Sequence, residues 1–205
     1  MSDLDFVHRF VPAESSSRTL FLLHGTGGDE NDLLDLGRAI DPGAALLSPR
    51  GKVLEHGSPR FFRRLAEGVF DEADVMARAL ELADFVQAAV VQYEIDAERL
   101  VAVGYSNGAN IAAAMMLLGI APFRNAILLR PMVPLSNIQP PDLKDARVLL
   151  SAGRLDPIAQ PSIVEKLAAL FRAAHADVAL QLQQSGHELV AADAAAARAW
   201  LTPTN

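Results

Sequence analysis

The sequence predicts an α/β fold, in which a mostly parallel, doubly wound sheet of about seven strands carries helices on both faces. Short apolar runs alternate with segments of helical periodicity along the whole chain. Most of these runs are continuously apolar, which is typical of strands buried on both faces. Because no repeat, low-complexity tract or linker interrupts the 205 residues, we expect residues 1–205 to form a single domain without a large lid domain.

Six apolar runs and one edge segment are the strand candidates. The edge strand is expected at residues 6–11, and the other strands are expected at residues 19–23, 44–47, 100–104, 126–129, 147–152 and 178–183. Helices between successive strands make right-handed crossovers, so most of these strands are expected to run parallel. In a sheet of this kind, ligand sites gather beyond the carboxyl ends of the strands.

Four segments show the spacing of helices packed on a sheet. In residues 71–93 the apolar side chains recur at helical intervals, and Asp71 is placed to cap the first turn. Further helices are expected at residues 107–118, at 163–174 with Pro161 near the first turn, and in an alanine-rich segment at about 187–201. These segments alternate with the strand candidates, as a doubly wound sheet requires.

Charge and composition exclude several classes of partner. The formal net charge is −7 and the isoelectric point is about 5.2, so phosphate backbones and anionic membranes would repel the chain. We therefore expect no nucleic-acid partner. The N-terminus "MSDLDFVHRF" has acidic residues where a signal peptide has basic ones. The longest apolar run, residues 111–123, is shorter than the roughly 20 residues of a membrane span, so we expect a cytoplasmic protein with no membrane association.

A serine joins a predicted strand to a predicted helix in the stretch "VAVGYSNGANIAAAMMLL". Ser106 lies two residues from both Gly104 and Gly108, in a G-x-S-x-G pattern. If the strand turns directly into the helix, the serine adopts a strained conformation with its hydroxyl exposed, and side chains at 104 and 108 would collide with nearby backbone. Serine is also common as a helix N-cap, but a cap does not explain the two glycines. We therefore favour a nucleophilic role for Ser106.

A serine hydroxyl needs a base, which in turn needs an orienting acid. At a strand–serine–helix turn of this kind, the acid and then the histidine follow the serine along the chain. Of the five histidines, only His175 and His187 lie after Ser106. His175 falls at the end of a predicted helix, where a solvated side chain is the more common reading. His187 follows the last predicted strand, next to Gly186, and we predict that it is the base.

Asp156, in the stretch "LLSAGRLDPIAQP", is the best candidate for the acid. It leaves the penultimate predicted strand at the same edge of the sheet as Ser106, and Pro157 fixes the backbone after it. An aspartate before a proline is often only a turn residue. The other downstream aspartates fit worse: we expect two at the wrong end of the sheet, one at a strand start and one on a helix surface, namely Asp142, Asp145, Asp177 and Asp193.

The segment "LFLLHGTGGDEND" has three glycines in four residues after a predicted strand. It is a weak phosphate loop, because no lysine follows and the spacing is not G-x-G-x-x-G. The segment is better explained as half of an oxyanion hole. Its glycines let the backbone approach a substrate and leave the Thr26 N–H free to face a developing negative charge. The second donor would be the N–H of Asn107 at the helix start. His24 precedes the serine, so we assign it a structural hydrogen-bonding role below this loop.

These motifs resemble the α/β-hydrolase superfamily, and within it the small phospholipase/carboxylesterase family that includes acyl-protein thioesterases. The segments "HGTGGDEND", "GYSNGAN", "GRLDPIAQP" and "GHEL" stand in the family's order and span nearly the whole chain. The segments "SPRGKVLEHGSPRFFRRL" and "LLRPMVP" are most similar to a bacterial carboxylesterase branch. The resemblance implies Ser106 as nucleophile, Asp156 and His187 as its partners, and Thr26 and Asn107 as oxyanion donors.

The activity that this resemblance implies is hydrolysis of small-molecule carboxylic esters through an acyl-enzyme intermediate. No cofactor or metal is expected, and the absence of cysteine excludes disulfides, thiolate metal ligands and a cysteine nucleophile. Thioesterase, lactonase and lysophospholipase activities use the same machinery. Asn107 stands where the thioesterases usually have glutamine, and Ala109 where they usually have glycine, which weakens the transfer of a thioester substrate. A non-catalytic ligand-binding member of the fold and a nucleotide-binding protein are the alternatives from other classes.

Residues 50–70 form a long segment on the predicted active edge, where long loops are often functional. Phe61, Phe62 and Phe70 would wall an acyl or aryl pocket. The equally weighted alternative is that they anchor the segment as ordinary core. Arg63 and Arg64 would meet an acidic substrate or simply face solvent. The exposed alanines of the last helix would suit a contact between two copies in a homodimer.

Overall fold

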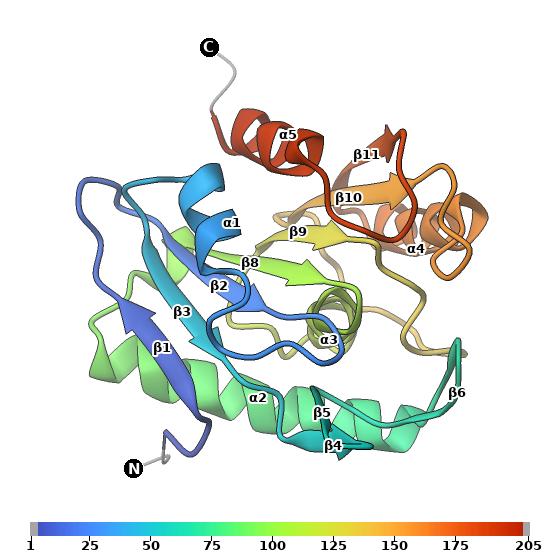
Figure 1. Cartoon of the computed structure of the whole chain (residues 1–205), viewed down its shortest axis with the longest axis horizontal. Coiled ribbons are helices and arrows are strands. Elements are labelled where there is room, and N and C mark those ends of the chain that lie inside the picture. The colour runs from blue at the N-terminus through green and yellow to red at the C-terminus, as the bar shows by residue number, and fades with distance from the viewer. Residues whose placement is uncertain (1–3, 203–205) are drawn as a thin grey trace.

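A seven-stranded sheet forms the centre of the molecule (Figure 1). The computed structural model describes residues 4–202, and the strand order in its main sheet is β1-β3-β2-β8-β9-β10-β11. Every neighbouring pair is parallel except β1 and β3, so the predicted sheet is confirmed. The strands are β1 (His8–Val11), β2 (Thr19–Leu23), β3 (Ala45–Pro49), β8 (Leu100–Tyr105), β9 (Asn125–Leu129), β10 (Arg147–Gly153) and β11 (Asp177–Gln183).

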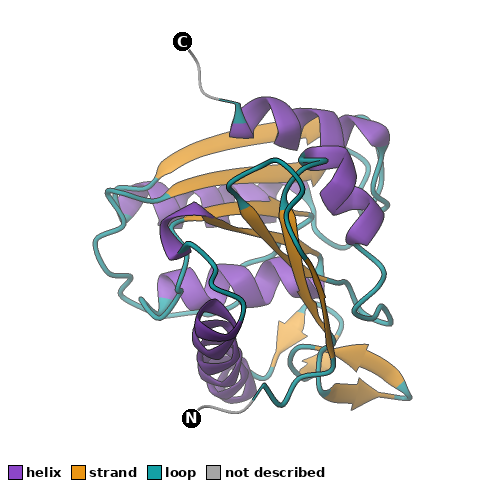
Figure 2. Ribbon diagram, turned by 90° about the vertical axis from the view of Figure 1, so that its left-hand side faces the viewer, coloured by secondary structure: helices purple, strands orange, loops and turns teal. Residues whose placement is uncertain are grey.

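Within residues 4–202, five α-helices cover both faces of this sheet (Figures 1 and 2): α1 (Leu34–Ile40), α2 (Glu72–Gln92), α3 (Asn107–Leu117), α4 (Pro161–Ala173) and α5 (Ala191–Leu201). The helices α2, α3 and α4 bury the larger hydrophobic core against one face. The helices α1 and α5 close a smaller core on the other face. No helix in this part of the chain combines the length and apolar character that crossing a membrane requires.

Local sequence signals account for most of these elements. The predicted strands agree with the observed ones to within one or two residues at each end. Helix α2 begins after Asp71, whose carboxylate accepts a hydrogen bond from the N–H of Asp74, as the sequence predicts. Helix α5 begins at Ala191, later than expected, because the residues around His187 form a loop that ends where Asp193 accepts a hydrogen bond from the Val190 N–H.

Three short features escape the sequence prediction. Helix α1 has only seven residues and contains Gly37, which lets it lie close to the sheet: a Cβ there would be 2.9 Å from Leu46 Cδ2. Residues 50–70, expected as a loop, contain two small hairpins, β4 (Val53–Glu55) with β5 (Ser58–Arg60) and β6 (Arg64–Ala66) with β7 (Val69–Phe70). Strands of two or three residues are too short to show the alternation from which strands are predicted.

Helix α3 starts directly after β8, and two glycines make this junction possible. A Cβ on Gly104 would lie 2.6 Å from the backbone of Ala109, and a Cβ on Gly108 would overlap the carbonyl group of Leu23 at the end of β2. The collisions predicted from the sequence are therefore confirmed. Because every residue of α3 is buried, the start of this helix is held rigidly at the carboxyl edge of β2 and β8.

Candidate active site

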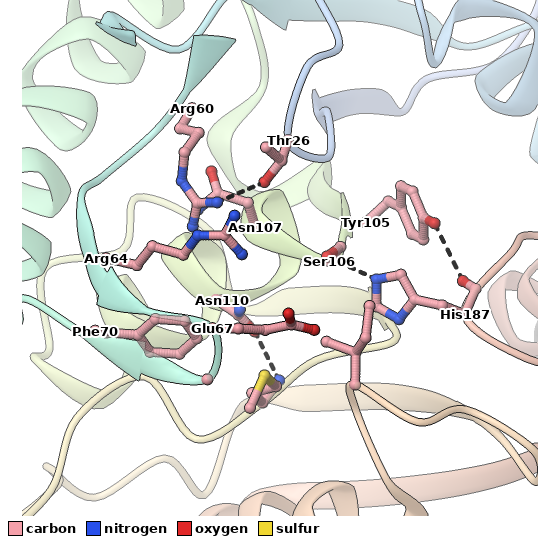
Figure 3. A pocket seen from close by; sticks show the side chains of 13 residues that line it. Thr26, Arg60, Arg64, Glu67, Phe70, Tyr105, Ser106, Asn107, Asn110 and His187 are labelled. Carbon is pink, nitrogen blue, oxygen red and sulfur yellow. Dashed lines mark hydrogen bonds between the residues drawn. The ribbon is translucent and has the colours of Figure 1, made fainter. Parts of the chain in front are cut away.

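Three loops at the carboxyl edge of the sheet bring Ser106, Asp156 and His187 together. Ser106 follows β8, Asp156 follows β10 and His187 follows β11. The Nε2 atom of His187 lies 2.9 Å from Ser106 Oγ, and its Nδ1 atom lies 2.7 Å from Asp156 Oδ2. Figure 3 shows the imidazole ring turned toward Ser106. The three residues singled out in the sequence thus form one hydrogen-bonded chain.

The backbone of Ser106 has the strained conformation that the sequence predicts. Its φ is 50° and its ψ is −110°, a region that side-chain-bearing residues rarely occupy. The Ser106 N–H donates to the carbonyl of Leu129 at 2.8 Å, which ties the turn to the end of β9. The Ser106 side chain makes no capping hydrogen bond to α3. Ser106 therefore occupies the N-cap position of α3 without capping the helix through its side chain, and its hydroxyl faces His187 instead.

The carboxylate of Asp156 is held from both of its oxygens. Its side chain is fully buried. Its Oδ1 atom accepts hydrogen bonds from the N–H groups of Ile158 at 2.8 Å and Ala159 at 2.9 Å, which leaves Oδ2 for the imidazole. Two backbone donors to the same oxygen fix the orientation of the group. Asp156 is therefore positioned to orient His187.

These contacts determine which nitrogen of His187 carries its proton. A carboxylate only accepts hydrogen bonds, so Nδ1 carries the hydrogen that is donated to Asp156. In the neutral imidazole Nε2 then carries no hydrogen, and its lone pair accepts from the Ser106 hydroxyl. The Tyr105 hydroxyl donates to the His187 carbonyl at 3.1 Å and steadies the same loop. An imidazole held in this way can take the proton of the serine hydroxyl.

The two expected oxyanion donors lie beside Ser106. Thr26 and Asn107 both line the pocket that contains Ser106 and His187. Within the described part of the chain, neither of their backbone N–H groups donates a hydrogen bond to a protein acceptor. Asn107 begins α3, so its N–H belongs to the unpaired first turn of a helix. Both donors are therefore available to a negatively charged oxygen in the pocket.

His24 has the structural role that we assign to it from the sequence. Its ring is buried, and its Nε2 atom accepts a hydrogen bond from the N–H of Gly51 at 2.9 Å. Burial lowers the pKa of the His24 imidazole, which favours the neutral form that this hydrogen bond requires. The ring also packs against Phe61 at a centroid distance of 4.7 Å. His24 thereby joins the glycine-rich loop to the segment 50–70.

Comparison with known proteins shows the family. No protein-family model matches the chain. It is 47% identical over 186 residues to the Bacillus subtilis (strain 168) protein named "Putative hydrolase MhqD", covering 91% of this chain and 93% of that protein. The Bacillus cereus carboxylesterase structure matches it with a TM-score of 0.93 and 42% identity, covering 97% and 94% of the two chains. The Mesorhizobium loti carboxylesterase structure matches with a TM-score of 0.93 and 36% identity, covering 98% and 96%.

The chain belongs to the carboxylesterases of the α/β-hydrolase superfamily. It is accordingly an enzyme that hydrolyses esters of small molecules, and the interpretation as a non-catalytic binding protein is set aside. Within residues 4–202 of this carboxylesterase, no cluster of three or more His, Asp or Glu side chains is arranged to hold a metal ion.

A cavity of about 220 Å³ opens over Ser106 in the carboxylesterase. Its wall combines the aromatic rings of Phe70 and Tyr105 and the apolar side chains of Met132 and Ile158 with several charged and polar groups (Figure 3). The lining residues are Thr26, Arg60, Arg64, Glu67, Gly68, Phe70, Tyr105, Ser106, Asn107, Asn110, Met132, Ile158 and His187. This volume suits a compact substrate.

Two of the three phenylalanines expected in the pocket wall lie in the core instead. Phe61 is 3% exposed and Phe62 is 0% exposed, and both belong to the larger hydrophobic core. Phe70 does line the pocket, and its ring meets the edge of Phe62 at a centroid distance of 5.1 Å. The short strands of the segment 50–70 pair with one another and not with the main sheet, so the segment needs apolar anchors. Phe61 and Phe62 are those anchors, in agreement with the alternative interpretation that they attach the segment to the core.

A fully buried arginine holds the loop that carries His187, and sequence reasoning missed it. Arg130 follows β9 with a φ of 54°, and its guanidinium forms a bidentate pair with Asp193, with both N–O distances at 2.9 Å. Asp193, expected on a helix surface, is therefore buried. The same guanidinium donates to the carbonyls of Gly186 at 3.2 Å and Glu188 at 3.0 Å, on either side of His187. The sequence signal that could have drawn attention to Arg130 is its position between an apolar strand and a proline.

We expect Phe62→Ala and Phe70→Ala to affect different properties of the enzyme. Phe62→Ala leaves a cavity in the core and should lower the free energy of unfolding by about 3–5 kcal/mol. Phe70→Ala removes part of the pocket wall and should mainly raise KM for short p-nitrophenyl esters. Urea unfolding and steady-state kinetics of both variants check this. A Phe62→Ala variant with unchanged stability and an altered substrate preference would contradict the assignment.

We expect Arg130→Met to destabilise the protein by about 3–5 kcal/mol, because it leaves the Asp193 carboxylate buried without its partner. The double variant Arg130→Met/Asp193→Asn should be more stable than the single one, since it removes the unpaired charge. Arg18→Met is the control: it breaks a partly exposed pair with Asp41 and should cost about 1 kcal/mol or less. Urea unfolding measures all three, and a double variant less stable than Arg130→Met would refute this explanation.

Proposed function

We propose that this carboxylesterase cleaves esters through an acyl-enzyme formed on Ser106, with His187 as general base and acid and Asp156 as the orienting carboxylate. The observation that carries the proposal is the unbroken hydrogen-bonded chain from Asp156 Oδ2 through both nitrogens of His187 to Ser106 Oγ, with links of 2.7 Å and 2.9 Å. The order of the three groups is the one that a serine nucleophile requires.

In the first step Ser106 Oγ attacks the ester carbonyl carbon while His187 Nε2 takes the hydroxyl proton. The carbonyl π pair moves to oxygen, which becomes the oxyanion of a tetrahedral intermediate. The N–H groups of Thr26 and Asn107 then donate hydrogen bonds to this oxyanion, and the N-terminus of α3 adds its positive dipole. Asp156 stabilises the imidazolium that forms in the same step. Each oxyanion donor is expected to contribute about 3–4 kcal/mol to transition-state stabilisation.

In the second half of the reaction the intermediate collapses and the ester C–O bond breaks. His187 Nε2 gives its proton to the departing alcohol oxygen, which leaves the acyl group on Ser106. A water molecule then attacks the acyl carbon and passes a proton to the same nitrogen. When the acyl-enzyme bond breaks, that proton returns to Ser106 Oγ and the carboxylic acid departs. The enzyme is restored, and one water has been consumed for each ester.

The contacts of the segment 50–70 support the proposed oxyanion hole. Arg60 Nη1 donates to Thr26 Oγ1 at 2.8 Å, the N–H of Gly27 donates to the Pro59 carbonyl at 2.9 Å, and the N–H of Phe61 donates to Asn107 Oδ1 at 2.7 Å. These bonds fix both sides of the hole before substrate binds, which is the arrangement that electrostatic catalysis needs. A cytoplasmic location and a homodimer stay predictions from the sequence.

The test is the hydrolysis of p-nitrophenyl acetate by purified variants. We expect Ser106→Ala to lower kcat by about 10⁴-fold or more, because the nucleophile is lost. Asp156→Asn should lower kcat by roughly the same order, because the amide favours the wrong tautomer of His187. Ser162→Ala, on the exposed first turn of α4, is the matched control and should keep the wild-type rate. A Ser106→Ala variant as active as the wild type would refute the proposal.

A further inference from the structure

Two guanidinium groups lie side by side in the wall of the pocket. Arg60 comes from β5 and Arg64 from β6, and Figure 3 shows both groups directed into the cavity near Asn107. Arg60 is only 3% exposed, which is unusual for an arginine. Its burial lowers the pKa of the guanidinium, as does the charge of Arg64, while Glu55 raises it. An arginine remains charged at neutral pH despite such a shift.

Among the residues that the structure describes, only the carboxylate of Glu55 pairs with these two guanidinium groups. Glu55 Oε2 lies 3.0 Å from Arg60 Nη1, and Glu55 Oε1 lies 2.8 Å from Arg64 Nε. The pair of arginines therefore keeps one positive charge in excess, in a chain whose formal net charge is −7. Glu67 also lines the pocket, but it forms no ion pair with either arginine within residues 4–202. It lies in the exposed turn between β6 and β7.

Several donors of the two arginines are unused. The Nε atom of Arg60 donates to the Phe62 carbonyl at 3.1 Å, and its Nη1 atom donates to Thr26. The Nε atom of Arg64 donates to Glu55. In the described chain, Arg60 Nη2 and both Nη atoms of Arg64 make no hydrogen bond to a protein group. Guanidinium N–H groups match the two oxygens of a carboxylate, so free donors of this kind favour binding of such a group.

The position of this charge relative to the reacting centre limits the substrate. Arg60 donates a hydrogen bond to the hydroxyl of Thr26, whose N–H is a proposed oxyanion donor, so the excess charge lies close to the proposed oxyanion hole. The whole cavity measures about 220 Å³. A molecule that contacts both Ser106 and the arginines within this cavity therefore has only a short chain between its ester and its second polar group.

We propose that Arg60 and Arg64 form a carboxylate-binding subsite, and that the preferred substrates are compact esters that carry a free carboxylate. Either the acid part carries it, as in a half-ester of a short dicarboxylic acid, or the alcohol part carries it, as in the ester of a hydroxy acid. This inference rests on the proposed function of Ser106, because the two arginines are assigned to substrate binding on the ground that they line the same cavity as that nucleophile. Glu67 opposes such a substrate and sets how strongly it is preferred.

The test compares kcat/KM for matched anionic and neutral esters. For the acid part, the pair is p-nitrophenyl hemisuccinate and p-nitrophenyl pentanoate. For the alcohol part, the pair is acetoxyacetate and butyl acetate, and pH-stat titration measures the rate at which each is hydrolysed. The anionic-to-neutral ratio is compared between the wild type and each variant, which cancels the intrinsic reactivity of the esters. Arg64→Gln is the main variant, because its side chain is one-third exposed and tolerates replacement.

We expect Arg64→Gln to lower the anionic-to-neutral ratio of kcat/KM about tenfold or more for one of the two ester pairs. The affected pair also identifies whether the acid part or the alcohol part of the substrate carries the carboxylate. Glu67→Gln should raise the same ratio, since it removes the opposing charge. Arg63→Gln is the matched control: this neighbouring arginine is 63% exposed, pairs with Asp71 and does not line the pocket. Its ratio should equal that of the wild type, and melting temperatures verify that every variant is folded.

An unchanged ratio in both arms for Arg64→Gln would overturn the subsite. An equal fall for Arg63→Gln would also overturn it, because the preference would then reflect the field of the whole surface. Failure of the proposed function is a separate result: Ser106→Ala would retain hydrolysis of the neutral esters.

Discussion

The hydrogen bond between Ser106 Oγ and His187 Nε2 joins two loops that are 81 residues apart in the sequence, and the surrounding structure holds both of its ends in place. On the serine side, Gly104 and Gly108 allow β8 to turn into α3 within one residue, which pushes the hydroxyl out at the edge of the sheet. On the histidine side, three successive carbonyls, those of residues 186–188, accept hydrogen bonds from Arg130 or Tyr105. The loop therefore has little freedom to rotate the imidazole away.

The buried charged groups Asp156, Arg130 and Asp193 lie where the orientation of a side chain or loop of the site is fixed. The Asp156 carboxylate is oriented by two backbone N–H groups, and the Arg130–Asp193 pair is bidentate and fully buried. Desolvation makes such groups costly unless every donor and acceptor is satisfied, and both are well satisfied here. The arginine pair in the pocket differs, because free donors remain there beside a single shared carboxylate. The fully hydrogen-bonded charged groups of this protein hold the catalytic loops in position. The arginine pair in the pocket, which is only partly paired, is the group that we assign to substrate binding.

The sequence predicted those parts of the site that local patterns determine. A strand-to-helix turn and a loop after a buried strand are visible over ten residues, so Ser106, Asp156 and His187 could be chosen before any coordinates. Arg130 could not be matched to Asp193, because the pairing depends on α5 lying over β10 and the sequence does not state which faces meet. The expectation that Phe62 lines the pocket failed for the same reason. The sequence around an aromatic residue in a long segment is the same whether its side chain faces a pocket or the core.

Covalent labelling tests the central claim most directly. The 205-residue enzyme would be treated with a fluorophosphonate, digested and mapped by mass spectrometry, and the labelling rate would be compared with that of His187→Gln. We predict one adduct per chain, on Ser106, formed far more slowly in the variant because the base is missing. An adduct on another residue, or a labelling rate at Ser106 that does not depend on His187, would contradict the account.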